Sequence, residues 1–288
     1  MSSTPKTIQI FLPGGNPLGI RVAEVTTRIL QIIEVPRILL RDFLSMPESG
    51  QVALYFLVSA SDDGTRLDVY VGQTGDLRAR LAIHNRDKDF WQRALVLISR
   101  THSLTQTHSL FLEWHSLQKI RAADRFKDSN GNSGSKPHTP APLEADCLEI
   151  FETAHTLLAT LGFRLFDPVV KESDTPTESD LMFAVASGAD GRGIYTPEGF
   201  VVLHGSSGRK DMVPSMLDTA YAKAREPLLV SGILKVEGDR VVFTKDHLFT
   251  SPSAAAAVLL GRNANGWVEW KSKEGKTLDA LKRQSPAL

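Results

Sequence analysis

The stretch LDVYVGQTGDLRARLAIHNRD, from Leu67 to Asp87, decides how the first half of this chain is expected to fold. It begins as a β-strand, passes through a glycine-containing turn and continues as a short helix. Arg80 and His84 are four positions apart on that helix and therefore share one face. Such a face is either ordinary solvated surface or a place for an anionic ligand, and the surrounding sequence has to distinguish the two.

The segments around this stretch predict a small mixed α+β domain. A strand precedes it in QVALYFLVSA, and Asp63-Gly64 is a strong hairpin signal that would place Tyr55 and Tyr70 on neighbouring strands. The apolar run 94–99 predicts a third strand of an antiparallel sheet. Apolar periodicity predicts helices over 106–123 and 143–161.

The remaining chain divides by composition into a lead-in, a linker and a second, smaller α+β domain. Residues 1–45 are expected to be a strand followed by a helix interrupted near Pro36, because Val22, Val25, Ile29, Ile32 and Ile33 recur at helical intervals. Residues 46–166 then form the first domain. The acidic, proline-containing segment 167–180 is expected to be a linker.

Residues 181–288 are expected to be an accessory domain with several short strands, one of them over PLLVSGIL. An alanine-rich helix is expected after Ser251, which is a good N-terminal cap followed by proline. The segment GWVEWKSKEGKTL is expected to form a terminal hairpin.

Composition and charge indicate a globular protein of the cytoplasm with no membrane partner. The chain has 288 residues, a net charge of zero and a single cysteine, Cys147, which excludes an internal disulfide framework. No apolar run reaches the length of a membrane span. Between residues 66 and 127, however, there are 11 Lys and Arg against six Asp and Glu, so a local basic face is expected.

Several residues of the first domain carry side chains suited to phosphodiester chemistry. Arginine offers fixed donors to phosphate oxygens, and histidine can relay a proton near neutral pH. Glu113 borders an apolar helical stripe, where a carboxylate either pairs with a base or binds a cation. For Tyr55 and Tyr70 the alternative is ordinary packing. Asn130 and Asn132 lie in a glycine-rich loop where asparagine is common.

The order of these motifs resembles the GIY-YIG nuclease superfamily. The matching segments are ALY (53–55), YVGQT (70–74), LRARLAIH (77–84), LEW (112–114) and the asparagine-bearing loop. Ala53 and Leu54 replace the Gly and Ile of the first motif, which are backbone and packing positions. The segment from Phe249 to Lys271 resembles the C-terminal domain of unknown function that follows a subset of these nucleases, and the N-terminal segment is similar to the lead-in of that subset.

The resemblance implies a metal-dependent endonuclease that hydrolyses DNA. Glu113 would ligate one Mg²⁺ or Mn²⁺ ion, and Arg80 would offset the charge of the transition state. Tyr55 would assist deprotonation of the attacking water with His84 relaying the proton, and Tyr70 would orient the water or the phosphate. Asn130 or Asn132 would complete the site, and the sequence does not separate them.

Basic side chains near these motifs are candidates for contacts with the DNA backbone. They are Arg78, Arg86, Lys88, Arg93, Lys119 and Arg121. DNA is therefore the expected partner, either duplex or single-stranded, and the C-terminal domain is a candidate site for a protein partner. The alternatives are a non-cleaving nucleic-acid-binding or scaffold protein on the same fold, and a nuclease that acts on RNA or single strands.

Overall fold

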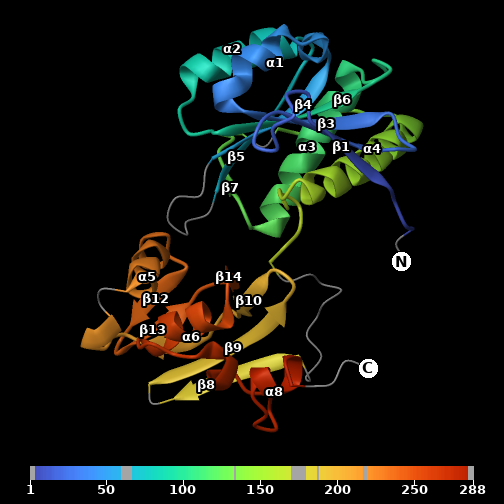
Figure 1. Cartoon of the computed structure of the whole chain (residues 1–288). Helices are drawn as coiled ribbons and strands as arrows, with labels where there is room; N and C mark the ends of the chain where they lie inside the picture. Colours follow the sequence, from blue (N-terminus) through green and yellow to red (C-terminus); the bar gives the residue numbers. More distant parts are fainter. Residues whose placement is uncertain are drawn as a thin grey trace. The chain divides into compact units, whose positions relative to one another are not determined.

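The computed structural model divides into two compact units, one that ends at Pro168 and one that begins at Val169 (Figure 1). The structure describes residues 4–59, 67–132, 134–169, 180–186, 188–216 and 219–284. The expected Asp63-Gly64 turn and most of the expected acidic linker lie outside these residues. Both units combine helices with a β-sheet, so the fold is mixed α+β.

The sheet of the N-terminal unit has seven strands in the order β1-β2-β3-β6-β4-β5-β7. The strands are β1 (Ile8–Phe11), β2 (Arg21–Val25), β3 (Leu30–Pro36), β4 (Ala53–Val58), β5 (Asp68–Thr74), β6 (Arg93–Ser99) and β7 (Lys127–Asp128). All neighbours are antiparallel except β5 and β7. The expectation of a three-stranded sheet is therefore too small, because the strands of the lead-in extend the same sheet beyond β6.

The expected helix across the lead-in is wrong, since β2 and β3 form an antiparallel hairpin there. Six of the seven residues of β3 are buried. A strand covered on both faces has no alternation of apolar and polar residues, so its apolar positions matched a helical spacing by coincidence. Pro36 ends β3 instead of interrupting a helix.

Helices cover both faces of this sheet, and consecutive residues of β4 point alternately to them. One core contains Phe56 together with side chains of α3 (Gln106–Ala123) and α4 (Ala141–Thr160). The other contains Tyr55 together with side chains of α1 (Leu40–Ser45) and α2 (Leu77–Asp87). Two short 3-10 helices, η1 (Arg37–Leu39) and η2 (Pro47–Gly50), flank α1.

A buried carboxylate ties the lead-in to the centre of the sheet. Glu34 of β3 has no exposed surface and accepts hydrogen bonds from Arg21 of β2 and, at 2.6 Å, from Nη1 of Arg93 of β6. Two guanidinium partners compensate the buried charge, whereas loss of one partner from a buried pair costs about 3–5 kcal/mol. The lead-in is therefore an integral part of the unit.

The sheet of the C-terminal unit also has seven strands, with β8 pairing β9 outside the order β12-β13-β11-β9-β10-β14. The strands are β8 (Leu181–Ala186), β9 (Ala189–Thr196), β10 (Gly199–Val202), β11 (Ser207–Arg209), β12 (Leu234–Glu237), β13 (Arg240–Phe243) and β14 (His247–Phe249). The helices are α5 (Ala220–Val230), α6 (Pro252–Leu260), α7 (Gly266–Glu269) and α8 (Leu278–Lys282), with a 3-10 helix, η4, at Pro214–Met216.

One local prediction for this unit is wrong, one holds in part and one is confirmed. The first half of PLLVSGIL ends α5, which tolerates Pro227 in its interior, and only the second half reaches a strand. The expected terminal hairpin begins with α7, and its later part turns back so that Lys271 pairs with Thr277 in an antiparallel bridge. Helix α6 is confirmed, because the Ser251 side chain accepts a hydrogen bond from the Ala254 amide as a cap. None of the helices in the described part of the chain could span a bilayer.

Candidate functional site

The hydroxyl of Tyr55 lies at the centre of a polar cluster in the N-terminal unit. Nε of Arg80 donates a hydrogen bond to it at 3.2 Å, and Nε2 of His84 lies 2.8 Å from it. Tyr55 has no exposed surface, and His84 is 4 % exposed. Two residues of one helix therefore share a hydrogen-bonded arrangement with a buried tyrosine about 25 positions earlier in the sequence.

A glycine on the neighbouring strand makes room for the Tyr55 ring. Tyr55 and Gly72 face each other in the antiparallel pair of β4 and β5. A Cβ atom on Gly72 would lie only 2.3 Å from the Tyr55 hydroxyl and 2.5 Å from its Cζ atom. Gly72 of the YVG motif is therefore needed because it has no side chain, which leaves space for the Tyr55 ring. It is not needed for an unusual backbone conformation.

Helix α2 begins where its face can meet this hydroxyl. Asp76 caps its N-terminus by accepting a hydrogen bond from the Ala79 amide at 3.1 Å, and Leu77 and Leu81 are completely buried. Because these leucines fix the rotation of the helix, Arg80 and His84 both turn toward Tyr55.

The protonation states of the cluster follow from burial and from its cationic neighbours. Burial, with Arg80 and Lys88 nearby, lowers the pKa of His84 to about 4, so its imidazole is neutral at pH 7. Burial raises the pKa of Tyr55, and the two tyrosine hydroxyls raise the pKa of Arg80. Arg80 donates to the Tyr55 oxygen, and the Tyr55 hydroxyl shares a second hydrogen bond with Nε2 of neutral His84.

Tyr70 forms the accessible side of the cluster. Its ring meets the His84 ring edge-on with centroids 5.1 Å apart, and the Tyr55 ring centroid is 6.4 Å away. The ammonium of Lys88 lies 4.3 Å from the centre of the Tyr70 ring, within cation–π range. Unlike Tyr55, Tyr70 is only partly buried and can reach a bound molecule.

The outer edge of β5 explains how Glu113 joins the cluster from α3. Strand β7 pairs only with Asp68 and Val69, so the later part of this edge is open. Asn130 continues the ladder with its side chain, accepting from the Val71 amide at 2.9 Å and donating to the Val71 carbonyl at 2.7 Å. The next outward amide, that of Gln73, donates to the Glu113 carboxylate.

Glu113 is half-buried at this edge. Burial raises its pKa, while the Gln73 amide and the charge of Arg80 oppose that shift. The carboxylate is also close enough to Tyr55 to raise the pKa of the phenol. The structure therefore brings Glu113 into electrostatic contact with the cluster that contains Tyr55, Tyr70, Arg80 and His84.

The two asparagines have different positions. Both ends of the Asn130 amide are used by the Val71 backbone, so Asn130 holds the loop on the sheet edge. Asn132 is exposed and accepts a hydrogen bond from the Gly134 amide at 3.1 Å. Among the described residues, the hydrogen bonds of Asn130 and Asn132 involve no side chain of the cluster.

Most of the basic residues expected near the substrate already have partners. Arg93 binds buried Glu34, and Arg121 forms an ion pair with Asp128, so each of them has a structural role within the unit. Arg86 pairs with its neighbour Asp87, and Nε of Arg78 donates to the Ser49 hydroxyl at 3.1 Å. Lys88 is beside Tyr70, and Lys119 is exposed on α3.

The donor set of this cluster restricts the kind of metal that it could hold. In the part of the chain that the structure describes, no three His, Cys, Asp or Glu side chains gather as a metal cage. The cluster offers one carboxylate, Glu113, whose pKa the nearby Gln73 amide lowers. A single carboxylate fits Mg²⁺, which keeps several waters and completes its shell with phosphate oxygens.

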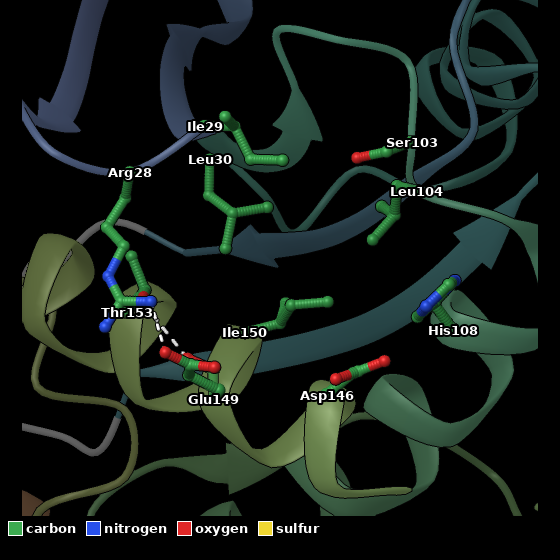
Figure 2. A pocket seen from close by; sticks show the side chains of 10 residues that line it. All are labelled: Arg28, Ile29, Leu30, Ser103, Leu104, His108, Asp146, Glu149, Ile150 and Thr153. Atoms are coloured by element: carbon green, nitrogen blue, oxygen red, sulfur yellow. Dashed lines mark hydrogen bonds and ion pairs between the residues drawn. The ribbon is translucent and has the colours of Figure 1, made fainter. Parts of the chain in front are cut away.

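A cavity of about 300 Å³ in the same unit is separate from this cluster (Figure 2). Its charged groups include Arg28 and Glu149, which are paired with each other, and its floor is apolar around Leu30 and Ile150. Leu30 belongs to the core beneath α3 and α4, on the sheet face opposite Tyr55. None of its lining residues belongs to the Tyr55 cluster.

Comparison with known families gives one match, in the C-terminal unit. The family described as Domain of unknown function (DUF4357) matches residues 181–282. This agrees with the expected C-terminal domain of unknown function, and it does not extend to the unit that carries the Tyr55 cluster. No curated protein and no solved structure matches the chain.

Proposed function

We propose that the N-terminal unit is a metal-dependent endonuclease of the GIY-YIG type that hydrolyses DNA phosphodiester bonds. The observation that carries this proposal is the convergence of Arg80, His84 and Glu113 on two tyrosines at one open sheet edge. A phosphodiester needs a cationic donor, a proton acceptor and a cation ligand close together, and this cluster has all three.

Glu113 is the proposed ligand of a single Mg²⁺ or Mn²⁺ ion. When bound, such an ion polarises the phosphate and stabilises the departing oxygen. The Gln73 amide orients the carboxylate and favours its ionised form, which is the form that binds a cation. Substrate phosphate and water would complete the coordination, so the affinity for the metal without DNA is expected to be low.

The chain's own residues divide the remaining tasks. Arg80 stays cationic beside both hydroxyls and stabilises the charge that develops on the phosphate. Neutral His84 can accept a proton through Nε2. The complete burial of Tyr55 favours a positioning role, in which its hydroxyl holds Arg80 and His84 in place. Partly exposed Tyr70 is then the better candidate to contact the attacking water, which reverses the roles expected from the resemblance alone.

DNA is the substrate that we propose, with contacts to phosphates and not to bases. Lys88 lies beside Tyr70, Arg78 is exposed on α2, and Lys119 adds an exposed charge on α3. Contacts of this kind hold a backbone without reading sequence. The second candidate class, a non-cleaving nucleic-acid-binding protein, shares the basic residues but has no use for a half-buried glutamate in the same cluster as a neutral histidine.

A cleavage assay tests the proposal on the full chain. The protein is incubated with supercoiled plasmid, linear duplex, single-stranded DNA and RNA, each with Mg²⁺, Mn²⁺ or a chelator. We expect chelator-sensitive cleavage of DNA. Glu113→Gln and Arg80→Ala are each expected to lower the rate at least about 100-fold, a loss typical of a removed transition-state contact.

Matched variants show whether such losses are specific. Glu152→Gln and Arg41→Ala change exposed residues of the same types in the same unit and should keep the wild-type rate. Wild-type activity in Glu113→Gln would overturn the metal site. Binding to DNA without cleavage in any metal would favour the non-cleaving alternative, and cleavage of RNA alone would change the substrate class.

A further inference from the structure

The C-terminal unit contains a pocket of about 480 Å³ with an arginine in its wall. The wall is built by α5, by the segment after β11 and by β12 and β13. The lining residues are Lys210, Asp211, Met212, Ala222, Lys223, Arg225, Glu226, Leu229, Val236 and Val241. This volume lies within the range of pockets that bind small molecules or parts of larger ones.

Arg225 is the unusual residue of this wall. It is only 2 % exposed, and it lies on the buried stripe of α5 between Ala222 and Leu228, where an apolar residue is expected. Nη2 donates to the Arg209 carbonyl, while Nη1 is buried and has no hydrogen-bond partner within the part of the chain that the structure describes. Burial lowers the pKa of this guanidinium, and the charge of Asp211 only partly opposes that effect.

A buried guanidinium with an unused donor is costly to a fold unless something binds it. Leaving a buried charged donor unsatisfied costs more free energy than leaving a neutral donor unsatisfied. Two further cations, Lys210 and Lys223, are exposed in the same wall, where they can meet an anion without a desolvation cost of their own. The lining carboxylates, Asp211 and Glu226, leave the wall with one net positive charge.

We propose that this pocket binds a phosphomonoester group, with Arg225 as its buried donor and Lys210 and Lys223 at the entrance. Guanidinium pairs with phosphate through parallel hydrogen bonds, and lysine adds charge. The apolar part of the wall, including Met212 and Leu229, suits the organic part of the ligand. Such a group occurs on a free nucleotide and at the end of a cleaved nucleic-acid strand, and both present the same chemistry to Arg225.

Equilibrium binding to the full chain in the presence of a chelator tests this proposal. The probes are inorganic phosphate, a nucleoside monophosphate, and one oligonucleotide with and without a terminal phosphate. We expect phosphate and the mononucleotide to bind, and the phosphorylated oligonucleotide to bind more tightly than its unphosphorylated form if strand ends are the natural ligand. Equal binding of both oligonucleotides, with a mononucleotide that binds, assigns the pocket to free nucleotides.

Variants link the binding to the pocket. Arg225→Met should weaken binding at least about tenfold, because it removes a charge-assisted hydrogen bond. Arg240→Met makes the same change at an exposed arginine outside the pocket and should bind as wild type. If Arg225→Met does not fold, the double variant Lys210→Met/Lys223→Met decides, since both residues are exposed.

The proposal is independent of the nuclease assignment. Arg80→Ala is expected to bind the mononucleotide normally even if it no longer cleaves DNA. Failure of every probe to bind, or unchanged binding in both pocket variants, would overturn the phosphomonoester site and would leave the proposal for the N-terminal unit untouched.

Discussion

Tyr55 holds Arg80 and His84 with one oxygen atom, and its ring occupies the space that a side chain on Gly72 would fill. The motif glycine and the motif tyrosine therefore depend on each other across two strands. This dependence could not be derived from the sequence, because the strand register that pairs Tyr55 with Gly72 is set by a turn and by packing.

Gly72→Ala is expected to lower the free energy of unfolding by about 1–3 kcal/mol, since the added methyl group overpacks a completely buried ring. The ring has to move, so the bonds to Arg80 and His84 are disrupted and the proposed cleavage activity should fall as well. Denaturant unfolding measures the first effect. Gly131→Ala, where nothing lies within 4 Å of the new Cβ, should change the stability by less than about 0.5 kcal/mol.

The low pKa of His84 predicts how stability depends on pH. The ordinary pKa is 6.5 and the folded-state pKa is about 4, so between these values the unfolded chain binds a proton that the folded chain does not. The free energy of unfolding therefore falls as the pH decreases through this window, by about 2 kcal/mol between about pH 7 and pH 4.5.

His84→Gln removes that titration while the other ionisable groups remain. The difference in stability between the two pH values should be about 2 kcal/mol smaller in the variant than in the wild type. Denaturant unfolding of both proteins at both pH values gives this comparison, and equal pH dependence would contradict a neutral, buried His84.

At the scale of elements, secondary structure that depends on the residues of one segment was predicted correctly. Secondary structure that depends on packing against other segments was not. The helix over 106–123 matches α3, because one of its faces is buried and its caps are local. The segment of β3 was predicted as a helix because other elements bury it on both faces. Its own residues therefore lack the alternation of apolar and polar side chains that marks a strand. Likewise, Arg93 and Arg121 looked free in the sequence because their partners, Glu34 and Asp128, are assigned only by the fold.

The edge of β5 gives Asn130 and Asn132 different expected effects. Asn130→Ala removes two hydrogen bonds to Val71 and should lower the free energy of unfolding by about 1–3 kcal/mol. Asn132→Ala changes an exposed loop residue and should alter it by less than about 0.5 kcal/mol. Denaturant unfolding of the two variants measures both, and similar losses would contradict the proposed role of Asn130 in the ladder.

At the scale of the whole molecule, each unit has its own apolar core. Residues 4–169 and 180–284, produced as separate chains, are therefore each expected to fold and to unfold cooperatively. Circular dichroism during heating tests this expectation. A fragment without a cooperative transition would show that it needs the rest of the chain.

Composition suggested two domains, and the acidic segment gave a boundary near the division between the units. The residues that the structure gathers around Tyr55 could be proposed together from the sequence because they fall in ordered motifs between 53 and 114. The sequence did not predict the pocket around Arg225. The end of α5 has the pattern of a strand, and only on a helix does Arg225 interrupt a row of buried apolar residues. A charged residue on the buried face of a correctly assigned helix would have been the signal.

The pairing of β3 with β6 also has a consequence for how the protein is made. The two strands run from Leu30↔Ser99 to Pro36↔Arg93, so the N-terminal hairpin has no partner on its inner side until β6 has been synthesised. At typical translation rates of about 5–20 residues per second, the apolar edge of β3 therefore stays unpaired for seconds during synthesis. Until β6 has been synthesised, this unpaired edge is a possible site of aggregation.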